Sequence, residues 1–160
     1  MFLPEIRFCG PEDVPAIVEA NGLSLYPWPD AVIARDLAAS PLSENAGEGL
    51  SYLGAFSRGA GSRLLGYAVM GHEAGFALLM GLMVLPEYRR RGIGTQLVLA
   101  VAECARSLGR TCLILRVGEA NAPARALYEG LSFRRGATRA HYYSDGENAV
   151  EMALSLTRSP

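Results

Sequence analysis

The chain has 160 residues, half of them hydrophobic, and a formal net charge of −1. We expect one globular domain over residues 1–160, because this length can bury a full core and the composition is too apolar for a disordered chain. A general nucleic-acid binder would be basic, so no nucleic-acid partner is expected. No stretch reaches the roughly 20 apolar residues that span a bilayer, and no signal peptide is evident. We therefore expect a cytoplasmic protein without a membrane partner.

The first half of the sequence predicts a strand, two helices and a strand hairpin. Ile6–Phe8 alternates apolar and polar residues, as a short strand does. Gly10–Asp13 has the acidic residues typical of a helix start. The prolines of Leu25–Pro29 separate the two helices, and polar turn residues form a loop before the hairpin. The predicted elements are the strand Ile6–Phe8, the helix from Gly10–Asp13, the helix Asp30–Ala39, the loop 41–49, and the strands Leu50–Phe56 and Leu64–Met70.

The second half alternates strands and helices and ends in another hairpin. Ile93, Leu97 and Val101 recur at helical spacing, and Gly109 ends that helix. Because a helix separates the strands before and after it, these two strands are predicted to be parallel. The predicted elements are the strand Phe76–Val84, the helix Ile93–Leu108, the strand Thr111–Val117, the helix Asn121–Gly130, and the strands Ala137–Tyr143 and Ala149–Leu156, joined around Ser144–Glu147.

The cysteines and histidines do not indicate a metal site. The three cysteines have no metal-ligand spacing, and Cys104 and Cys112 fall in apolar patterns typical of small core residues. His72 and His141 stand alone, so surface or hydrogen-bonded structural roles are expected for them. We predict a protein without a bound metal.

The turn Arg89–Thr95 connects a predicted buried strand to an amphipathic helix. A helix start exposes unpaired N–H groups at the positive end of the helix dipole, and arginines bind phosphate oxygens. This turn therefore predicts a phosphate site. A P-loop would require Gly-Lys-Ser or Gly-Lys-Thr, which is absent. A dinucleotide fingerprint would require a third glycine, where Leu97 stands, and an acidic residue, where Arg116 stands.

Arg89-x-x-Gly92-x-Gly94, after Val84–Tyr88, resembles the acetyl-CoA pyrophosphate loop of the GNAT superfamily of N-acetyltransferases. The resemblance implies an α/β GNAT fold: a mixed, mostly antiparallel sheet of six to seven strands with about four helices, splayed where acetyl-CoA enters. Acetyl-CoA would be the co-substrate. The strand backbone would hold the pantetheine arm and supply an oxyanion donor, and the turn would hold the pyrophosphate. The implied cofactor-binding residues are Leu82, Met83, Val84, Arg89, Arg90, Arg91, Gly92, Ile93, Gly94, Thr95, Asn121 and Tyr128.

A second block, Asn121–Phe133, supports this resemblance. Asn121 is a good helix N-cap, and the following Leu-Tyr pair matches the second GNAT block, although Ser132 stands where glycine is usual. The resemblance implies that Tyr128 is the catalytic acid that protonates the coenzyme A thiolate. A phenol with a pKa of about 10 can protonate a thiolate whose conjugate acid has a pKa of about 8.5. A packed aromatic residue at the core edge is the alternative role.

Three further features resemble the bacterial enzymes that acetylate the N-terminal alanine of a ribosomal protein. They are Tyr26–Trp28, Glu73-Ala74 and the segment Arg139–Leu154. In that group a glutamate before the second block is the general base, but Arg116 stands at the matching position. Glu73 and Glu119 are the remaining candidate bases, and solvated loop carboxylates are the alternative for each. The implied acceptor-side residues are Trp28, Arg116, Tyr142 and Tyr143.

The missing base bears on the acceptor. An α-amine with a pKa of about 7.7–8.0 is roughly one-fifth neutral near pH 7.2, whereas a lysine amine with a pKa of about 10.4 is neutral to less than about one part in a thousand. A peptide N-terminus therefore fits better than a lysine side chain. The alternatives are a small amine or amino acid, whose carboxylate could pair with Arg116, and a non-catalytic acyl-CoA-binding module. A monomer or a homodimer is expected.

Overall fold

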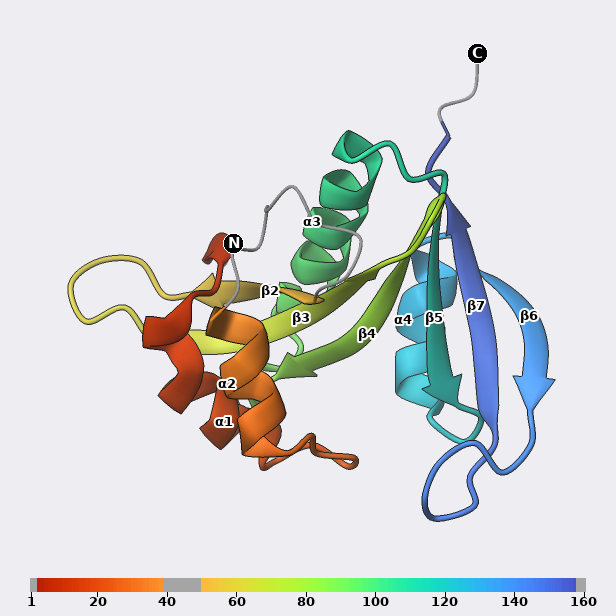
Figure 1. Cartoon of the computed structure of the whole chain (residues 1–160), viewed down its shortest axis with the longest axis horizontal. Helices are drawn as coiled ribbons and strands as arrows, with labels where there is room; N and C mark the ends of the chain where they lie inside the picture. The colour runs from red at the N-terminus through yellow and green to blue at the C-terminus, as the bar shows by residue number, and fades with distance from the viewer. Residues whose placement is uncertain (1–2, 39–49, 158–160) are drawn as a thin grey trace.

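The computed structural model describes residues 3–38 and 50–157, so the predicted loop 41–49 lies outside the described residues. Within this part of the chain, seven strands form one sheet in the order β1-β2-β3-β4-β5-β7-β6 (Figure 1). The strands are β1 (Glu5–Phe8), β2 (Leu50–Phe56), β3 (Leu64–His72), β4 (Phe76–Val84), β5 (Cys112–Gly118), β6 (Arg134–Arg139) and β7 (Ala149–Ser155). The α-helices are α1 (Val14–Asn21), α2 (Asp30–Ala38), α3 (Ile93–Ser107) and α4 (Ala122–Gly130), with short 3-10 turns η1 (Pro11–Asp13) and η2 (Pro86–Tyr88).

The sheet splits between its two central strands. β4 and β5 are parallel, as predicted, and they pair only where Phe76–Leu79 lies beside Cys112–Leu115. The register of β4 with β3 then shifts, which leaves Met80 as an extra bulged residue. A bulge bends its strand and increases the local twist, so β4 turns away from β5 beyond this point (Figure 1). The mostly antiparallel, splayed sheet expected from the sequence is confirmed.

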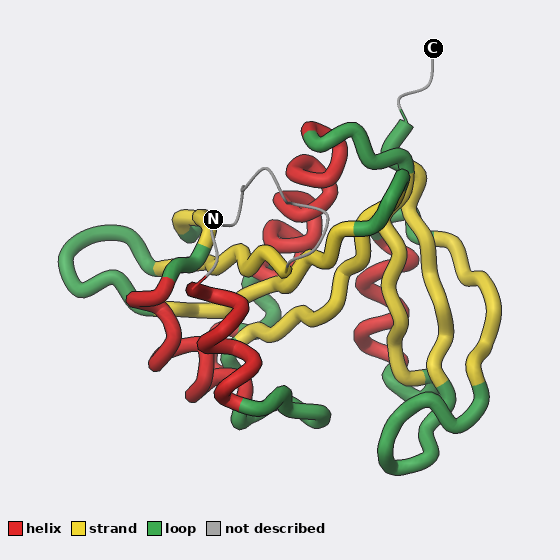
Figure 2. Tube along the Cα trace, in the orientation of Figure 1, coloured by secondary structure: helices red, strands yellow, loops and turns green. Residues whose placement is uncertain are grey.

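Helices cover both faces of the sheet (Figure 2). α3 and α4 pack on one face, where the fully buried Leu97 and Val101 join residues of the central strands in the larger core. α1 and α2 pack on the other face over β2 and β3, where Ile17 and Ile33 are fully buried in a second core. The cleft described below lies at the split between β4 and β5, and residues from both faces of the sheet line it.

The strand predicted at Ala137–Tyr143 is shifted. β6 instead runs over Arg134–Arg139 and pairs with β7, and the two tyrosines at 142 and 143 belong to the connection between β6 and β7. All residues of β6 are exposed, so its sequence has no alternation of apolar and polar residues that would mark its ends. The strand was predicted to reach the two tyrosines because aromatic residues are common in strands. The other predicted elements agree with the structure to within a few residues at their ends.

The remaining sequence expectations concern single residues. His72 is buried against Ser51, with its Nε2 3.1 Å from the serine Oγ, and the His141 N–H donates to the Asn148 side chain, so both histidines have structural contacts. Cys104 is half-buried and packs on the larger core. Among residues 3–38 and 50–157, no helix has the length and apolar character needed to cross a bilayer.

Candidate active site

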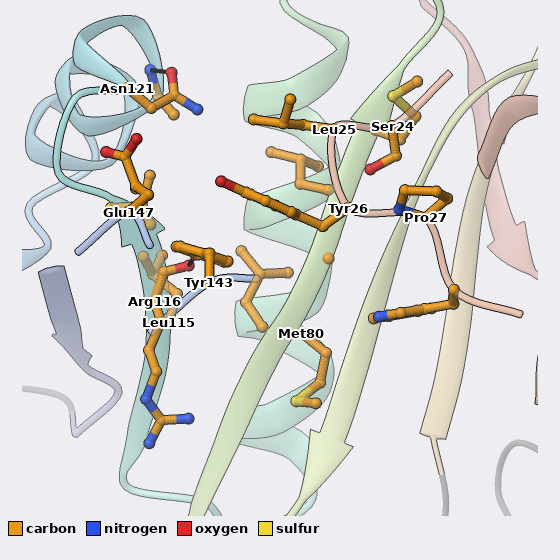
Figure 3. Close-up of a pocket in the computed structure, with 18 of the residues that line it drawn as sticks. Ser24, Leu25, Tyr26, Pro27, Met80, Leu115, Arg116, Asn121, Tyr143 and Glu147 are labelled. Carbon is orange, nitrogen blue, oxygen red and sulfur yellow. Dashed lines mark hydrogen bonds between the residues drawn. The ribbon is translucent and has the colours of Figure 1, made fainter. Parts of the chain in front are cut away.

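A cleft of about 1080 Å³ opens where β4 and β5 diverge (Figure 3). Its walls come from both layers of the molecule: β4 and β5, the first turns of α4, the connection between α1 and α2, and the connection between β6 and β7. Leu82 and Val117 lie on opposite strands of the split, and Tyr128 of α4 also lines the cleft. The cleft is therefore bordered by residues from the α4 side and from the α1–α2 side of the sheet.

The N-terminus of α3 adjoins this cleft and has the features of an anion site. Gly92 is the N-cap residue in a left-handed conformation (φ 78°), which glycine adopts without a steric penalty. The first N–H groups of an α-helix have no intrahelical partner, and Gly92, as the N-cap of this 15-residue helix, has no side chain that could accept from them. Gly94 lies beside Val84 and Leu127, at a distance where a Cβ would make ordinary van der Waals contacts of 3.7 Å with their side chains. These features fit a diphosphate.

The arginines before α3 add positive charge at the same place. The Arg89 side chain lines the cleft and donates from Nε to the Val84 carbonyl at 3.0 Å, which directs it back along β4. Arg90 adopts a left-handed backbone (φ 62°), as Gly92 does, so the chain turns sharply just before the helix. Arg91 lies over the Tyr88 ring, 5.6 Å from its centroid. The charges and the free N–H groups are complementary to the same anion.

The second half of β4 offers a free backbone edge. Leu82 and Met83 pair with β3 on one side, and β5 has already separated on the other side, so no described strand pairs with this edge. Both residues line the cleft. An extended amide-containing arm can therefore hydrogen-bond along this edge as an added strand would.

Asn121 and Tyr128 bring α4 into the cleft. The Asn121 side chain caps α4 by accepting from the Ala124 N–H at 3.3 Å, which confirms the predicted helix start. Tyr128 is buried and packs edge-to-face on Phe133, with ring centroids 5.6 Å apart. Burial raises the pKa of Tyr128 to about 12, and the nearby Tyr143 adds to the shift. The phenol therefore stays protonated at neutral pH and can donate a proton.

On the α1–α2 side, aromatic side chains from two distant loops meet. Tyr26 stacks on Tyr143 with ring centroids 4.3 Å apart, and its hydroxyl donates to Asp145 at 2.9 Å. The buried Asn21 side chain holds the base of this loop: it accepts from the Trp28 N–H at 3.0 Å and donates to the Trp28 carbonyl at 2.8 Å. The loop is therefore held at its base by Asn21 and at Tyr26 by the β6–β7 connection; Figure 3 shows Tyr26 next to Tyr143.

The rim around this stack is apolar. The side chains of Leu23, Leu25, Met80 and Tyr142 are among the largest exposed hydrophobic groups of the described chain, and all four line the cleft. Leu25 is 77% exposed. Exposed apolar groups that gather around one concave site indicate contact with a ligand or partner, whereas single scattered ones do not.

Two charged side chains line the cleft near β5, Arg116 from the strand itself and Glu147 from the β6–β7 connection. Arg116 lies 3.4 Å from Glu151 across the β5–β7 pair, and Arg139 approaches the same carboxylate at 3.6 Å, so this trio carries one net positive charge. Glu147 accepts from the Ala120 N–H at 2.8 Å, just beyond the end of β5. Among the described residues that line the cleft, Glu147 is the only Asp or Glu.

The structure brings most sequence-predicted site residues together and leaves a few apart. Glu73 lies in the β3–β4 turn and Glu119 pairs with Arg135 at 3.8 Å; neither lines the cleft. Val84 and the turn from Arg90 to Thr95 adjoin the cleft without lining it. The predicted residues that do line it are Trp28, Leu82, Met83, Arg89, Arg116, Asn121, Tyr128, Tyr142 and Tyr143.

Sequence reasoning missed Tyr26, Asn21 and Glu147. All three belong to connections or helix ends, whose positions depend on tertiary contacts rather than on periodicity. The available signal was the Tyr-Pro-Trp segment, which pointed to the loop but not to Tyr26 itself. Nothing in the sequence distinguishes Glu147 from other loop carboxylates.

Comparison with known proteins agrees with this geometry. The chain is 30% identical over 135 residues to the [ribosomal protein bS18]-alanine N-acetyltransferase of Escherichia coli K12, covering 82% of this chain and 83% of that protein. It is 38% identical over 79 residues to an N-alpha-acetyltransferase of Sulfurisphaera tokodaii, covering 49% of this chain and 47% of that relative. The crystal structure of the Escherichia coli ribosomal-protein-S18-alanine N-acetyltransferase superimposes with a TM-score of 0.80 at 26% identity, covering 99% of this chain and 97% of that one.

The family model described as the acetyltransferase (GNAT) family matches residues 17–133, which run from α1 through the N-terminus of α3 and through α4 to Phe133. The match covers most of the chain and includes both sequence blocks that the structure places beside the cleft. The chain belongs to the acetyltransferase (GNAT) family.

Proposed function

We propose that this protein transfers the acetyl group of acetyl-CoA to the N-terminal α-amine of a protein. One observation carries the proposal: a single cleft is lined by the free edge of β4, by the buried phenol of Tyr128 and by the stacked pair Tyr26 and Tyr143. Two reactants entering from opposite layers would meet inside it, which favours direct transfer in a ternary complex. The relatives named above, which modify N-terminal amines by their names, support this acceptor class.

Each part of the cleft has a proposed task. The N–H groups of Arg90–Thr95 and the arginine side chains would bind the diphosphate of acetyl-CoA, and the edge of Leu82–Val84 would hold its pantetheine arm. A β4 N–H would also stabilise the oxyanion that develops on the thioester carbonyl. Asn121 would hydrogen-bond the bound cosubstrate. Tyr128 would donate its phenolic proton to the departing thiolate.

The acceptor side fits a peptide terminus. The exposed apolar rim can contact side chains that follow the N-terminal residue, which a free small amine lacks. The residues of this rim, the stacked pair Tyr26 and Tyr143, and the strands on both sides of the split all line the same cleft. A low-pKa α-amine also needs less help in losing its proton than a lysine amine does.

Mixing the purified protein with acetyl-CoA and an alanine-starting hexapeptide, while following free thiol, tests this function. We expect turnover that is abolished when the peptide N-terminus is blocked, even if the peptide contains lysine. Turnover with the blocked peptide would contradict the proposed acceptor. A panel of amino acids and polyamines tests the second candidate, a small amine, which the position of Arg116 on the cleft wall supports. Tight acetyl-CoA binding without turnover on any amine would contradict both.

A further inference from the structure

We propose that Glu147 binds the ammonium group of the acceptor and takes its proton. This inference rests on the proposed function and identifies the residue that completes it. Most of an α-amine with a pKa of about 7.7–8.0 is protonated at pH 7, so a proton-accepting carboxylate at the acceptor side would speed the reaction. Arg116 occupies the strand position from which the sequence resemblance would supply that carboxylate. Glu147 reaches the same end of β5 from the β6–β7 connection, as its hydrogen bond to Ala120 shows.

The surroundings of Glu147 leave its charge available. Glu119 pairs with Arg135, and Glu151 is shared by two arginines, whereas Glu147 takes part in no ion pair among the described residues. Its hydrogen bond with the Ala120 N–H uses one carboxylate oxygen and holds the group in place. A fixed carboxylate without a cationic partner, at the edge of a cleft, is a suitable counter-ion for an incoming ammonium group.

The neighbouring groups are consistent with this role. Tyr26 lies in the α1–α2 connection and stacks on Tyr143, which lies in the same connection as Glu147. Asp145 of that connection accepts from the Glu147 backbone N–H at 3.0 Å. Arg116 of β5 lies on the same wall, but its side chain extends along the strand in the opposite direction from the Glu147 carboxylate (Figure 3). Glu151 offsets one of the two positive charges of Arg116 and Arg139, which lessens the repulsion that the ammonium group would meet.

The proton and electron balance is complete. An acceptor R–NH₃⁺ gives one proton to the Glu147 carboxylate, and the freed nitrogen lone pair forms the new C–N bond with the acetyl carbonyl carbon. The C–S bond breaks, and its electron pair leaves as thiolate, which takes the proton of Tyr128. As the amide forms, the nitrogen loses its second proton, which passes through water to the Tyr128 phenolate and restores the phenol. Glu147 releases its proton to solvent. No oxidant or reductant is required.

The test compares Glu147→Gln with the protein itself across pH, using the alanine hexapeptide. Glutamine keeps the acceptor for the Ala120 N–H but cannot take a proton or balance a positive charge. We expect kcat/KM to fall about 10- to 100-fold at pH 7, the size of effect typical of a charge-assisted hydrogen bond. The deficit should shrink above about pH 9, where an α-amine with a pKa of about 7.7–8.0 is neutral without assistance. The Kd for acetyl-CoA should be unchanged.

Two matched variants control the comparison. Glu129→Gln makes the same change on the exposed face of α4, outside the cleft, and should leave the pH profile unaltered. Glu119→Gln tests the neighbouring carboxylate. If Glu147→Gln lowers activity by one constant factor at every pH, or not at all, or if Glu119→Gln reproduces the pH-dependent loss, the assignment of Glu147 is wrong. Failure of the unmodified protein to acetylate any peptide would instead overturn the proposed function, and this inference with it.

Discussion

Tyr26 and Tyr143 stack face to face, with centroids 4.3 Å apart and ring planes 7° apart, although one follows α1 and the other precedes β7. The hydroxyl of Tyr26 binds Asp145 at a sequence separation of 119 residues. This pair joins the two loops that flank the proposed acceptor side of the cleft. The loops should therefore respond to substitution as one unit.

Replacing Tyr143 with alanine should raise KM for the peptide about 2- to 10-fold, the effect of losing an aromatic pair worth about 0.5–1.5 kcal/mol. Tyr26→Phe keeps the stack and loses only the hydrogen bond to Asp145, so its effect should be smaller. Steady-state kinetics with varied peptide would measure both. The Kd for acetyl-CoA should stay the same in each variant; a parallel loss of cosubstrate affinity would show that the stack does not act on the acceptor alone.

Tyr128→Phe should lower kcat about 100-fold or more, the usual contribution of a positioned general acid. The edge-to-face packing on Phe133 is preserved in this variant, so folding and acetyl-CoA binding should not change. Burial raises the pKa of the Tyr128 phenol to about 12, so the group remains protonated as pH rises through the working range. A kcat profile of the unmodified protein should accordingly show no decline from tyrosine ionisation below about pH 10. Such a decline, absent from Tyr128→Phe, would place the phenol's pKa far lower than its burial implies.

Reversing the charge of both Arg90 and Arg91 to glutamate should weaken acetyl-CoA binding by about tenfold or more, because each residue flanks the free N–H groups of α3. Isothermal titration calorimetry would measure this. Arg63→Glu, an exposed change at the β2–β3 turn, is the matched control. The effect should diminish at high salt, since exposed charges are screened. An unchanged affinity of the double variant for acetyl-CoA would mean that the N-terminus of α3 is not part of the binding site.

Asp13→Asn should destabilise the fold in a pH-dependent way. Burial opposes ionisation of Asp13, but hydrogen bonds from Arg7 and from the Gly10 N–H outweigh it and lower the pKa of the carboxyl. A lowered folded-state pKa gives stability that is present above the unfolded pKa of about 3.9 and is lost as pH falls through the folded value.

The expected cost at pH 7 is about 1 kcal/mol, reduced from that of a buried pair because the Arg7 side chain is 38% exposed. This corresponds to a Tm lower by about 2–4 °C. Thermal unfolding followed by circular dichroism should show the difference shrinking toward pH 3, where the native carboxyl begins to lose its charge. A constant difference across this range would mean that the variant acts through packing and not through the ion pair.

Local sequence signals predicted most of the fold. The helical spacing of Leu97 and Val101 identified α3, and Asn121 marked the start of α4, because both features depend on neighbours within a few turns. The β6 strand was misplaced because its exposed residues have no burial pattern, and its position is set by hydrogen bonds to β7. The parallel pairing of β4 and β5 followed from the intervening helix, but its end at Leu79 depends on the bulge at Met80.

The sequence by itself determined the proposed diphosphate site at the start of α3, since Gly92, Gly94 and the arginines lie within one short segment and their conformation follows from local chemistry. Only the tertiary structure decided the proposed acceptor side of the cleft. Tyr26, Arg116 and Glu147 come from three separate segments, and their meeting depends on the packing of α1 and on the β5–β7 register, through contacts that no local pattern encodes. Short-range backbone preferences can be read from adjacent residues, whereas side chains on loops acquire their neighbours only when the sheet has formed.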